Sequence, residues 1–364
     1  MIGKPDVAII GAGIVGLFAA LFFKQNRPGM RVSVFERSAF GAGATTRNAG
    51  FACFGSASEL LDDLHKQSES EVFSLVEKRW HGLRLLRQML GDAAIGFEPC
   101  GGVELFNEND REIAKTCLDF LPRANSLLAD VIGPEAFRPL RENFGFAGVE
   151  TTISSPFEGK INTGKMYRTL LQHARNAGVD VHFGIAISSI EQRPDSSVLL
   201  TPNGTIHARK VAVCTNGFAR HLLPDLDVQP GRNLVMVTQP LKDLPGQAFH
   251  YDQGYVYFRE IDGRLLIGGA RNADLQNEFT EAFDTNENIK NKLIEIVRHV
   301  LFPEHDIRID YIWSGIMGLG ESKTPLVGKT HEGLHYAVRM GGMGVALGSF
   351  TGRELAEGLL MEEL

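Results

Sequence analysis

The chain has 364 residues, an apolar fraction of 43% and a formal net charge of −7 from 37 basic and 44 acidic residues. This length and composition predict about two globular domains with a large core, and the absence of a basic block argues against nucleic acid as a partner. The four cysteines form no C-x-x-C pair. We therefore expect neither a disulfide framework nor a metal site, and a reducing compartment fits this cysteine usage.

The start of the chain gives no sign of export or membrane insertion. The first expected strand begins within ten residues of Met1, with no basic segment or small-residue cleavage site before it, so we expect no signal peptide. No uninterrupted apolar run reaches the roughly 20 residues that a membrane helix needs. The simplest expectation is a cytoplasmic protein without a transmembrane segment.

A strand, a glycine-rich turn and a helix follow one another at the start of the chain. Apolar residues 7–10 lead into the motif GAGIVG, and residues 17–23 are apolar and compatible with a helix. The first glycine permits a sharp turn, the second lets the backbone approach a pyrophosphate, and the third lets the helix pack closely on the sheet. Free N–H groups at the helix start would face the phosphates. The motif consists of Gly11, Ala12, Gly13, Ile14, Val15 and Gly16.

A second strand, residues 31–35, ends at Glu36, which Arg37 follows. A carboxylate at this position can accept hydrogen bonds from the ribose hydroxyls of an adenosine. The glycine motif alone could be a tight turn that binds nothing, and Glu36 alone could be a solvated carboxylate. Because strand, turn, helix and acid occur in the expected order, we favour dinucleotide binding.

A second glycine-rich stretch covers residues 41–51 and carries hydroxyls, a cation and an amide. Such a loop can wrap a cofactor with backbone donors. A surface loop is the alternative, but the stretch lies only one strand after the first phosphate turn, which favours cofactor binding. The candidate residues are Thr45, Thr46, Arg47, Asn48, Ala49 and Gly50.

The middle of the chain alternates between helical and strand patterns. Residues 59–90 and 107–129 are helical in character, and strands are expected between them in residues 95–106, where the chain enters another domain. A helix over 165–177 precedes expected strands at 179–183, 185–190, 198–201 and 209–215, which look like a return to the first sheet. The corner that follows could bring backbone near a nucleotide or could be a plain turn. Its residues are Thr215, Asn216 and Gly217.

The next part reads as an antiparallel sheet. Strands are expected at 234–238, 255–260, 264–270 and 311–315, with a hairpin turn at 262–263 and a helix over 281–302. By strand alternation Tyr255, Tyr257 and Arg259 share one face. That face could be the wall of a polar ligand pocket or the solvent side of the sheet.

The end of the chain returns to a pattern suited to a cofactor. Gly341, Gly342, Met343 and Gly344 precede an amphipathic helix over 351–361, which Ser349 or Thr351 could cap. A glycine-rich turn aimed through a helix N-terminus can stabilise negative charge on a bound ring system. Taken alone, the turn is only a tight connection.

Taken together and in this order, the motifs resemble the D-amino-acid oxidase type of FAD-dependent oxidoreductases, which includes glycine oxidase, sarcosine oxidase and D-amino-acid dehydrogenase. The resemblance covers essentially the whole chain. It implies an α/β fold in which a Rossmann-like FAD-binding domain, residues 1–90, 150–225 and 325–364, carries an inserted α+β substrate domain, residues 91–149 and 226–324, with a mainly antiparallel sheet. The motifs are GAGIVG with Glu36, GATTRNAGF, VAVCTNGFARHLLP, GYVYFREIDGRLLIGGAR, WSGIMGLGESKTPLVG and GGMG.

The resemblance also implies how FAD is held. The three glycines of the first motif would bind the pyrophosphate, Glu36 the ribose, and residues 45–50 the pyrophosphate and flavin. The backbone at Ile187 would meet the adenine, and residues 341–344 would lie at the pyrimidine end of the isoalloxazine. The cysteine that attaches flavin in sarcosine oxidases is missing near Ile316, so non-covalent FAD is expected.

The implied reaction is oxidation of the C–N bond of an amino acid or amine by hydride transfer to flavin N5, with oxygen or another acceptor taking the electrons. Tyr255 matches the tyrosine that binds the substrate carboxylate in glycine oxidase. The family arginine that clamps this carboxylate is replaced by Met317, and the lysine that sarcosine oxidases use instead is absent from residues 345–347. The cations that could replace it are Arg47, Arg259, Arg271 and Lys323.

Three alternatives remain at this stage. An amine without a carboxylate would need no such cation. An FAD-dependent 2-hydroxy-acid dehydrogenase would have the same fold, and a protein that binds FAD but has lost catalysis would explain the missing arginine. A nicotinamide enzyme is a further, weaker alternative.

Overall fold

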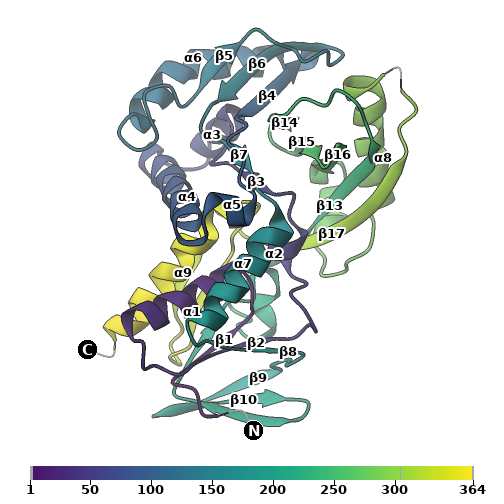
Figure 1. The fold of residues 1–364 in the computed structure, drawn as a ribbon. Coiled ribbons are helices and arrows are strands. Elements are labelled where there is room, and N and C mark those ends of the chain that lie inside the picture. Colours follow the sequence, from purple (N-terminus) through teal and green to yellow (C-terminus); the bar gives the residue numbers. More distant parts are fainter. Residues whose placement is uncertain (1–2, 304, 363–364) are drawn as a thin grey trace.

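The computed structural model describes residues 3–303 and 305–362. A six-stranded sheet forms the lower lobe in Figure 1, and it gathers strands from the beginning, middle and end of the chain. All neighbouring strands are parallel except the pair closest to the C-terminus, residues 326–329 and 335–338, which is antiparallel. Apolar runs such as VAII and KVAV suit strands that are buried on both faces. In spatial order the strands are β18 (Leu326–Lys329), β19 (His335–Val338), β12 (Lys210–Val213), β1 (Val7–Ile10), β2 (Val32–Glu36) and β8 (Asp180–Phe183).

Two layers cover this sheet. On one face Val7, Ile9 and Val32 pack in the cluster of α1 (Ile14–Asn26), α4 (Glu69–Leu90), α7 (Thr163–Asn176) and α9 (Gly344–Met361). On the other face, Ala8 and Ile10 pack with a small antiparallel sheet. The strands of this sheet are β9 (Ser189–Arg193), β10 (Ser196–Thr201) and β11 (Gly204–Ala208).

An eight-stranded sheet forms the upper lobe (Figure 1). Its neighbours are antiparallel except β14 and β4, which run parallel and join segments about 150 residues apart: Ala248 pairs with Gly102. In spatial order the strands are β17 (Ile309–Leu319), β13 (Gln229–Pro240), β16 (Arg264–Gly269), β15 (Val256–Ile261), β14 (Ala248–Tyr251), β4 (Gly102–Asn107), β6 (Val149–Ser155) and β5 (Arg138–Leu140).

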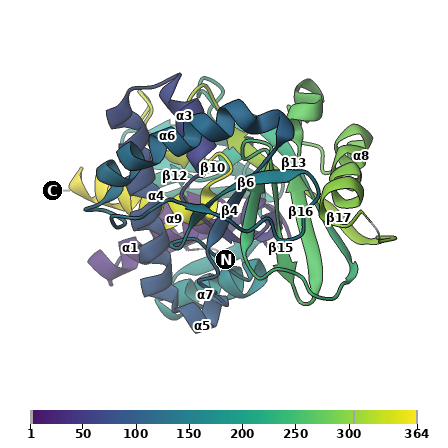
Figure 2. The ribbon, with the colours of Figure 1, turned by 90° about the horizontal axis from the view of Figure 1, so that it is seen from above.

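Helix α8 (Glu287–Ile296) covers the outer face of this sheet, as Figure 2 shows from above. Its Ile289 and Leu293 pack with Met236, Phe258 and Ile267 of the strands. Helix α6 (Arg111–Leu128) packs with α3 (Ala57–Leu64) beside the β4 end of the sheet. The opposite sheet face is therefore left to face the lower lobe, and strand alternation decides which side chains it carries. Shorter elements are α2 (Ala44–Arg47), α5 (Asp92–Ile95), the strand pair β3 (Phe51–Ala52) and β7 (Gly159–Lys160), the 3₁₀ helices Glu108–Asp110, Asn216–His221 and Arg271–Glu278, and the π-turn Val297–Leu301.

Several elements differ from the sequence prediction. The strands expected at 185–190 and 198–201 belong to the separate antiparallel sheet of β9, β10 and β11 and not to the first sheet, and the helix expected over 281–302 is Glu287–Ile296 followed by a π-turn. The helix expected over 59–90 is two helices, because Ser68 caps a new helix start with a capping box to Glu71. The strand expected at 185–190 begins only at Ser189, and residues 185–188 line a cavity instead. The last helix begins at Gly344 rather than near residue 351, and neither Ser349 nor Thr351 caps it; the Ser349 hydroxyl donates instead to the Gly82 carbonyl at 2.6 Å.

No helix among residues 3–303 and 305–362 is long and apolar enough to cross a membrane. We propose the division into a discontinuous domain, 1–90, 150–225 and 325–364, and an inserted domain, 91–149 and 226–324, because the two large sheets draw on different segments; β6 (Val149–Ser155) pairs within the eight-stranded sheet, so the boundary at 149/150 moves to residue 155. The six-stranded sheet uses 7–36, 180–213 and 326–338, and the eight-stranded sheet uses 102–155 and 229–319.

Candidate functional site

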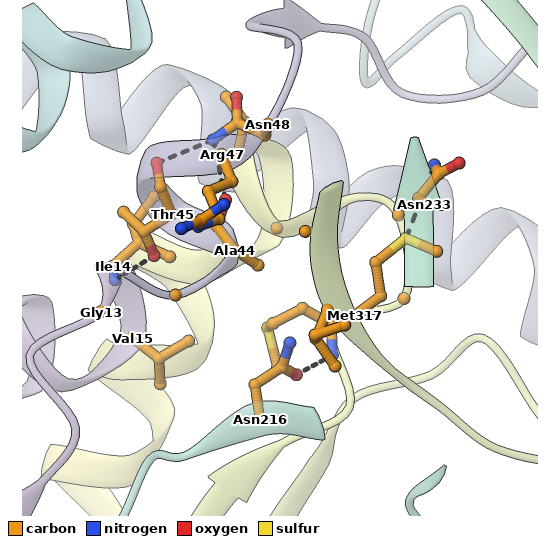
Figure 3. A pocket seen from close by; sticks show the side chains of 18 of the residues that line it. Gly13, Ile14, Val15, Ala44, Thr45, Arg47, Asn48, Asn216, Asn233 and Met317 are labelled. Carbon is orange, nitrogen blue, oxygen red and sulfur yellow. Dashed lines mark hydrogen bonds between the residues drawn. The ribbon is translucent and has the colours of Figure 1, made fainter. Parts of the chain in front are cut away.

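One cavity of about 890 Å³ lies where the two lobes meet. It is lined by the opening glycine turn, by residues 42–51, by the corner at 214–216 and by the terminal turn at 340–346. The opening turn and the terminal turn, more than 300 residues apart in sequence, therefore face the same space. Figure 3 shows residues from both lobes converging on this cavity.

The turn at the start of α1 is held in a shape that leaves its backbone accessible. Gly11 has φ +106°, and a Cβ there would lie 2.7 Å from the Cys214 carbonyl oxygen, so only glycine fits. Thr45 Oγ1 accepts a hydrogen bond of 2.9 Å from Ile14 N, which ties the second glycine-rich loop to the helix start (Figure 3). Glu36 is fixed beside the turn, because it accepts 3.1 Å from Ala12 N and 3.0 Å from Ser38 N.

The terminal turn is fixed against the opposite wall. Met340 N donates to Asn216 Oδ1 at 3.1 Å, and Gly341 N donates to the Gly318 carbonyl at 3.0 Å. Gly341 has φ +57°, which favours glycine. Since α9 begins at Gly344, its N-terminus lies directly in the cavity-lining turn. The partial positive charge of a helix N-terminus therefore faces the cavity at this end.

The cavity fits FAD. Glycine-rich turns at two helix N-termini expose backbone N–H groups that can donate hydrogen bonds to phosphate and to a polar ring edge. Glu36 supplies an acceptor for a ribose. The Thr215 hydroxyl lines the same space and is a buried oxygen without a hydrogen-bond partner, which a ligand would satisfy.

Most predicted site residues line this cavity. Four do not. Gly16 and Gly217 have packing roles, because a Cβ at these positions would overlap the carbonyl oxygens of Gly11 and Met317. The Thr46 hydroxyl donates to the Gly41 and Gly43 carbonyls, and Arg259 is described below. Those that line it are Gly11, Gly13, Ile14, Val15, Glu36, Arg37, Thr45, Arg47, Asn48, Ala49, Gly50, Ile187, Thr215, Asn216, Tyr255, Tyr257, Met317, Gly341, Gly342, Met343 and Gly344.

The eight-stranded sheet forms the cavity wall on the side of the upper lobe. His250, Tyr257, Gly268 and Val235 follow one another in register across β14, β15, β16 and β13. Residues in register share one sheet face, and His250, Tyr257 and Val235 line the cavity from it. Gly268 makes room for the Tyr257 ring, because a Cβ there would lie 2.8 Å from its hydroxyl.

Tyr257 and Asn233 form a polar pair on this wall. Asn233 Nδ2 donates to the Tyr257 hydroxyl at 3.2 Å, and Asn233 Oδ1 is buried without a partner. Met317 Sδ lies 4.0 Å from Asn233 Nδ2 (Figure 3). Burial raises the pKa of Tyr257, so this phenol stays protonated at neutral pH and can donate a hydrogen bond.

Three of the four cations considered as carboxylate clamps are already engaged. Arg259 is buried and donates to the Ala49 carbonyl at 2.6 Å and to the Ile161 carbonyl at 3.2 Å. The structure therefore does not bring Arg259 into the cavity with Tyr255 and Tyr257; its guanidinium anchors the loop that does line it. Arg47 donates to the Ala42 and Ser314 carbonyls. Lys323 pairs with Asp63 at 2.6 Å.

Arg271 differs from these three. It lines the cavity and makes no hydrogen bond or ion pair with any residue in the described parts of the chain, and its Nη1 is buried without a partner. Burial lowers the pKa of Arg271 from its usual value, although an arginine remains charged at neutral pH. Tyr255 is its neighbour: it is 44% exposed at the cavity lining, and its carbonyl accepts a hydrogen bond of 2.7 Å from Ala270 N.

Sequence reasoning missed a second polar group of the wall. His250 lies 2.9 Å from Glu158, measured between Nε2 and Oε2, and Cys53 lies beside them. Burial disfavours the charged imidazole, but the Glu158 carboxylate outweighs it and raises the pKa of His250 to about 9. Cys53, Glu158 and His250 belong to no local sequence motif, because they lie about 100 residues apart and meet only in the folded protein.

Comparisons with known proteins agree with this arrangement. The family model described as FAD dependent oxidoreductase (DAO) matches residues 6–358. The probable oxidoreductase OrdL of Rhizobium meliloti (strain 1021) is 27% identical, with 97% of this chain and 82% of that protein covered. The glycine oxidase of Geobacillus kaustophilus (strain HTA426) is 25% identical, with 98% and 93% covered. The solved structure of L-proline dehydrogenase from P. horikoshii has a TM-score of 0.81 at 16% identity, with 100% and 95% covered.

Proposed function

The chain belongs to the FAD dependent oxidoreductase family, and from that premise we propose that it oxidises the C–N bond of an amino acid or of a related amine that carries a carboxylate. Membership confirms the family, the fold class and the FAD cofactor that the sequence predicts. The observation that carries the proposal is Arg271, whose guanidinium lines the cavity, has a buried Nη1 without a partner and makes no hydrogen bond or ion pair within the described parts of the chain.

Arg271 is only partly exposed and its Nη1 is buried; a partly desolvated cation without a counter-ion is costly, and a bound carboxylate would offset that cost. A guanidinium can hold a carboxylate by two parallel hydrogen bonds. Arg271 is only two residues beyond the strand that pairs with β15, and Tyr255 immediately precedes β15. Tyr255 and Arg271 thus supply, from one end of a hairpin, the tyrosine and the cation of a carboxylate clamp, although Met317 occupies the usual arginine position.

The remaining residues orient the substrate and shape its surroundings. Bound FAD supplies the two-electron oxidation. The protonated Tyr257 phenol and the unpaired Asn233 Oδ1 offer a donor and an acceptor on the sheet wall for the polar groups of the substrate. The N-terminus of α9 favours negative charge at the terminal turn. We further propose that FAD is held without a covalent bond and that oxygen or another acceptor takes the electrons.

The named relatives support an amino-acid substrate: one is a glycine oxidase and one structural neighbour is an L-proline dehydrogenase. A 2-hydroxy acid would use the same carboxylate clamp, so the experiment must separate C–N from C–O oxidation. FAD-loaded protein is mixed without oxygen with L- and D-amino acids, N-methyl amino acids, amines that lack a carboxylate, and 2-hydroxy acids. Loss of the flavin absorbance is followed, and dithionite serves as the control for a reducible flavin.

We expect amino acids or N-substituted amino acids to bleach the flavin, and each carboxylate-free analogue to be much slower. Bleaching by hydroxy acids alone, or by simple amines as fast as by amino acids, would overturn the proposal. If dithionite bleaches the flavin and no organic reductant does, the protein binds FAD without this catalysis. Repeating the reaction in air with peroxide detection identifies whether oxygen is the acceptor.

A further inference from the structure

Three side chains of different chemistry meet in the cavity wall. Cys53, Glu158 and His250 come from segments about 100 residues apart, and their ligand atoms all lie within 4.8 Å of one another. All three are more than 90% buried, and Cys53 and His250 also line the cavity. A thiol, a carboxylate and an imidazole are the three side-chain ligands that zinc prefers.

The fold makes room for this cluster. Gly102 of β4 lies beneath Glu158, and a Cβ at this position would overlap its carboxylate. His250 stands on β14, the strand that pairs with β4, and its Nε2 lies 2.9 Å from Glu158 Oε2. Ligand atoms that share one tetrahedral zinc ion at about 2.0–2.3 Å lie roughly 3–4 Å apart, so the pair is already close to the spacing that an ion requires.

The surroundings favour a soft or borderline cation. The Met343 thioether lies 3.8 Å from the Cys53 sulfur, and Glu59 lines the same part of the cavity with its carboxylate. Burial and the Glu158 and Glu59 carboxylates raise the pKa of Cys53 against a smaller opposing effect of Arg79, so the free site holds a thiol that loses its proton when a cation binds. Sulfur, imidazole and carboxylate ligands together suit zinc rather than magnesium or calcium.

We propose that Cys53, Glu158 and His250 form a binding site for a single zinc ion, with a fourth coordination position that opens into the cavity. Three protein ligands and one open position are typical of zinc sites that accept an exogenous ligand. Binding releases the thiol proton and any proton shared by His250 and Glu158. The site departs from the sequence expectation of no metal, which rested on the absence of closely spaced cysteines.

Equilibrium dialysis of the FAD-loaded full chain against zinc at micromolar concentration tests the site, with metal measured by mass spectrometry and FAD by absorbance. We expect one zinc per chain. Cys53→Ser and His250→Ala should each weaken binding by more than about 100-fold, because loss of a ligand should exceed the loss seen on removing an outer-shell partner. Cys117→Ser is the matched control, since Cys117 is a buried free cysteine of α6 outside the cavity, and it should bind zinc like the parent protein.

Alkylation of the parent protein gives a second measurement that needs no variant. Zinc should slow iodoacetamide labelling of Cys53, followed by peptide mass spectrometry, and leave Cys100 labelling unchanged. Any of three results would overturn the site. These are less than about a tenth of an equivalent of zinc bound, zinc binding that survives both ligand substitutions, and labelling of Cys53 that zinc does not slow. Neither readout depends on turnover, so they fail or succeed separately from the proposed amine oxidation.

Discussion

Replacing Arg271 with leucine removes a cavity-lining guanidinium that makes no hydrogen bond or ion pair within the described parts of the chain and lies 5.9 Å from the centroid of the Phe279 ring. A hydrogen bond to a charged group contributes about 1.5–3 kcal/mol, and truncating one partner of a buried charge pair costs about 2–5 kcal/mol. We take about 3 kcal/mol, which corresponds to a rise in substrate Kd of roughly 100-fold. Arg271→Lys keeps the charge but loses the planar fork, and a rise of roughly tenfold, about 1.4 kcal/mol, is expected.

The assay is the anaerobic reductive half-reaction in a stopped-flow spectrometer, in which saturation of the bleaching rate gives Kd. The best amino acid of the screen is compared with its decarboxylated analogue, whose Kd should not respond to either Arg271 variant. Arg264→Leu is the matched control: Arg264 begins β16, the strand that ends two residues before Arg271, pairs with Asp310 at 2.7 Å and does not line the cavity. A Kd for Arg271→Leu within about twofold of the parent value, or an equal loss for the decarboxylated analogue, would refute the clamp.

Four further outcomes are expected. Gly13→Val should abolish FAD binding, because the added side chain occupies the backbone surface that faces the pyrophosphate; a yellow protein with full FAD content would contradict this. Tyr255→Phe should raise the substrate KM while FAD content is unchanged, and identical kinetics would exclude Tyr255 from the clamp. Arg259→Met should lower the free energy of unfolding by about 2–4 kcal/mol in urea melts, since it leaves the buried Ala49 and Ile161 carbonyls without their donor; an unchanged melt would show that the anchor is dispensable. Acid precipitation should release all FAD into the supernatant, and flavin retained in the protein pellet would indicate a covalent bond.

The sequence predicted the parts of the fold that are determined by short-range sequence patterns. The first strand, the glycine turn and the acid after the second strand lie within 36 residues, and their order is enough to place a nucleotide. Strand alternation likewise put Tyr255 and Tyr257 on one face. The last helix was predicted to start too late, because the apolar, glycine-containing segment 344–350 has no polar cap and looks like a continuation of the turn.

The rest depended on long-range contacts. Arg259 lies within the β15–β16 hairpin and Arg271 follows it. Only the folded positions of the Ala49 and Ile161 carbonyls decide which of the two guanidinium groups is hydrogen-bonded to the backbone. The meeting of Cys53, Glu158 and His250 depends on β14 running parallel to β4, a contact between strands separated by the whole middle of the chain. No spacing pattern in a single sequence contains that information.

A crystal structure of the FAD-loaded protein would show whether the cavity holds the cofactor in this orientation. We expect density for the adenosine beside Glu36 and for the ring system beside residues 341–344, with Tyr257 of the sheet wall and Arg271 opposite the ring. A ring system located away from the terminal turn, or an adenosine outside the opening turn, would contradict it.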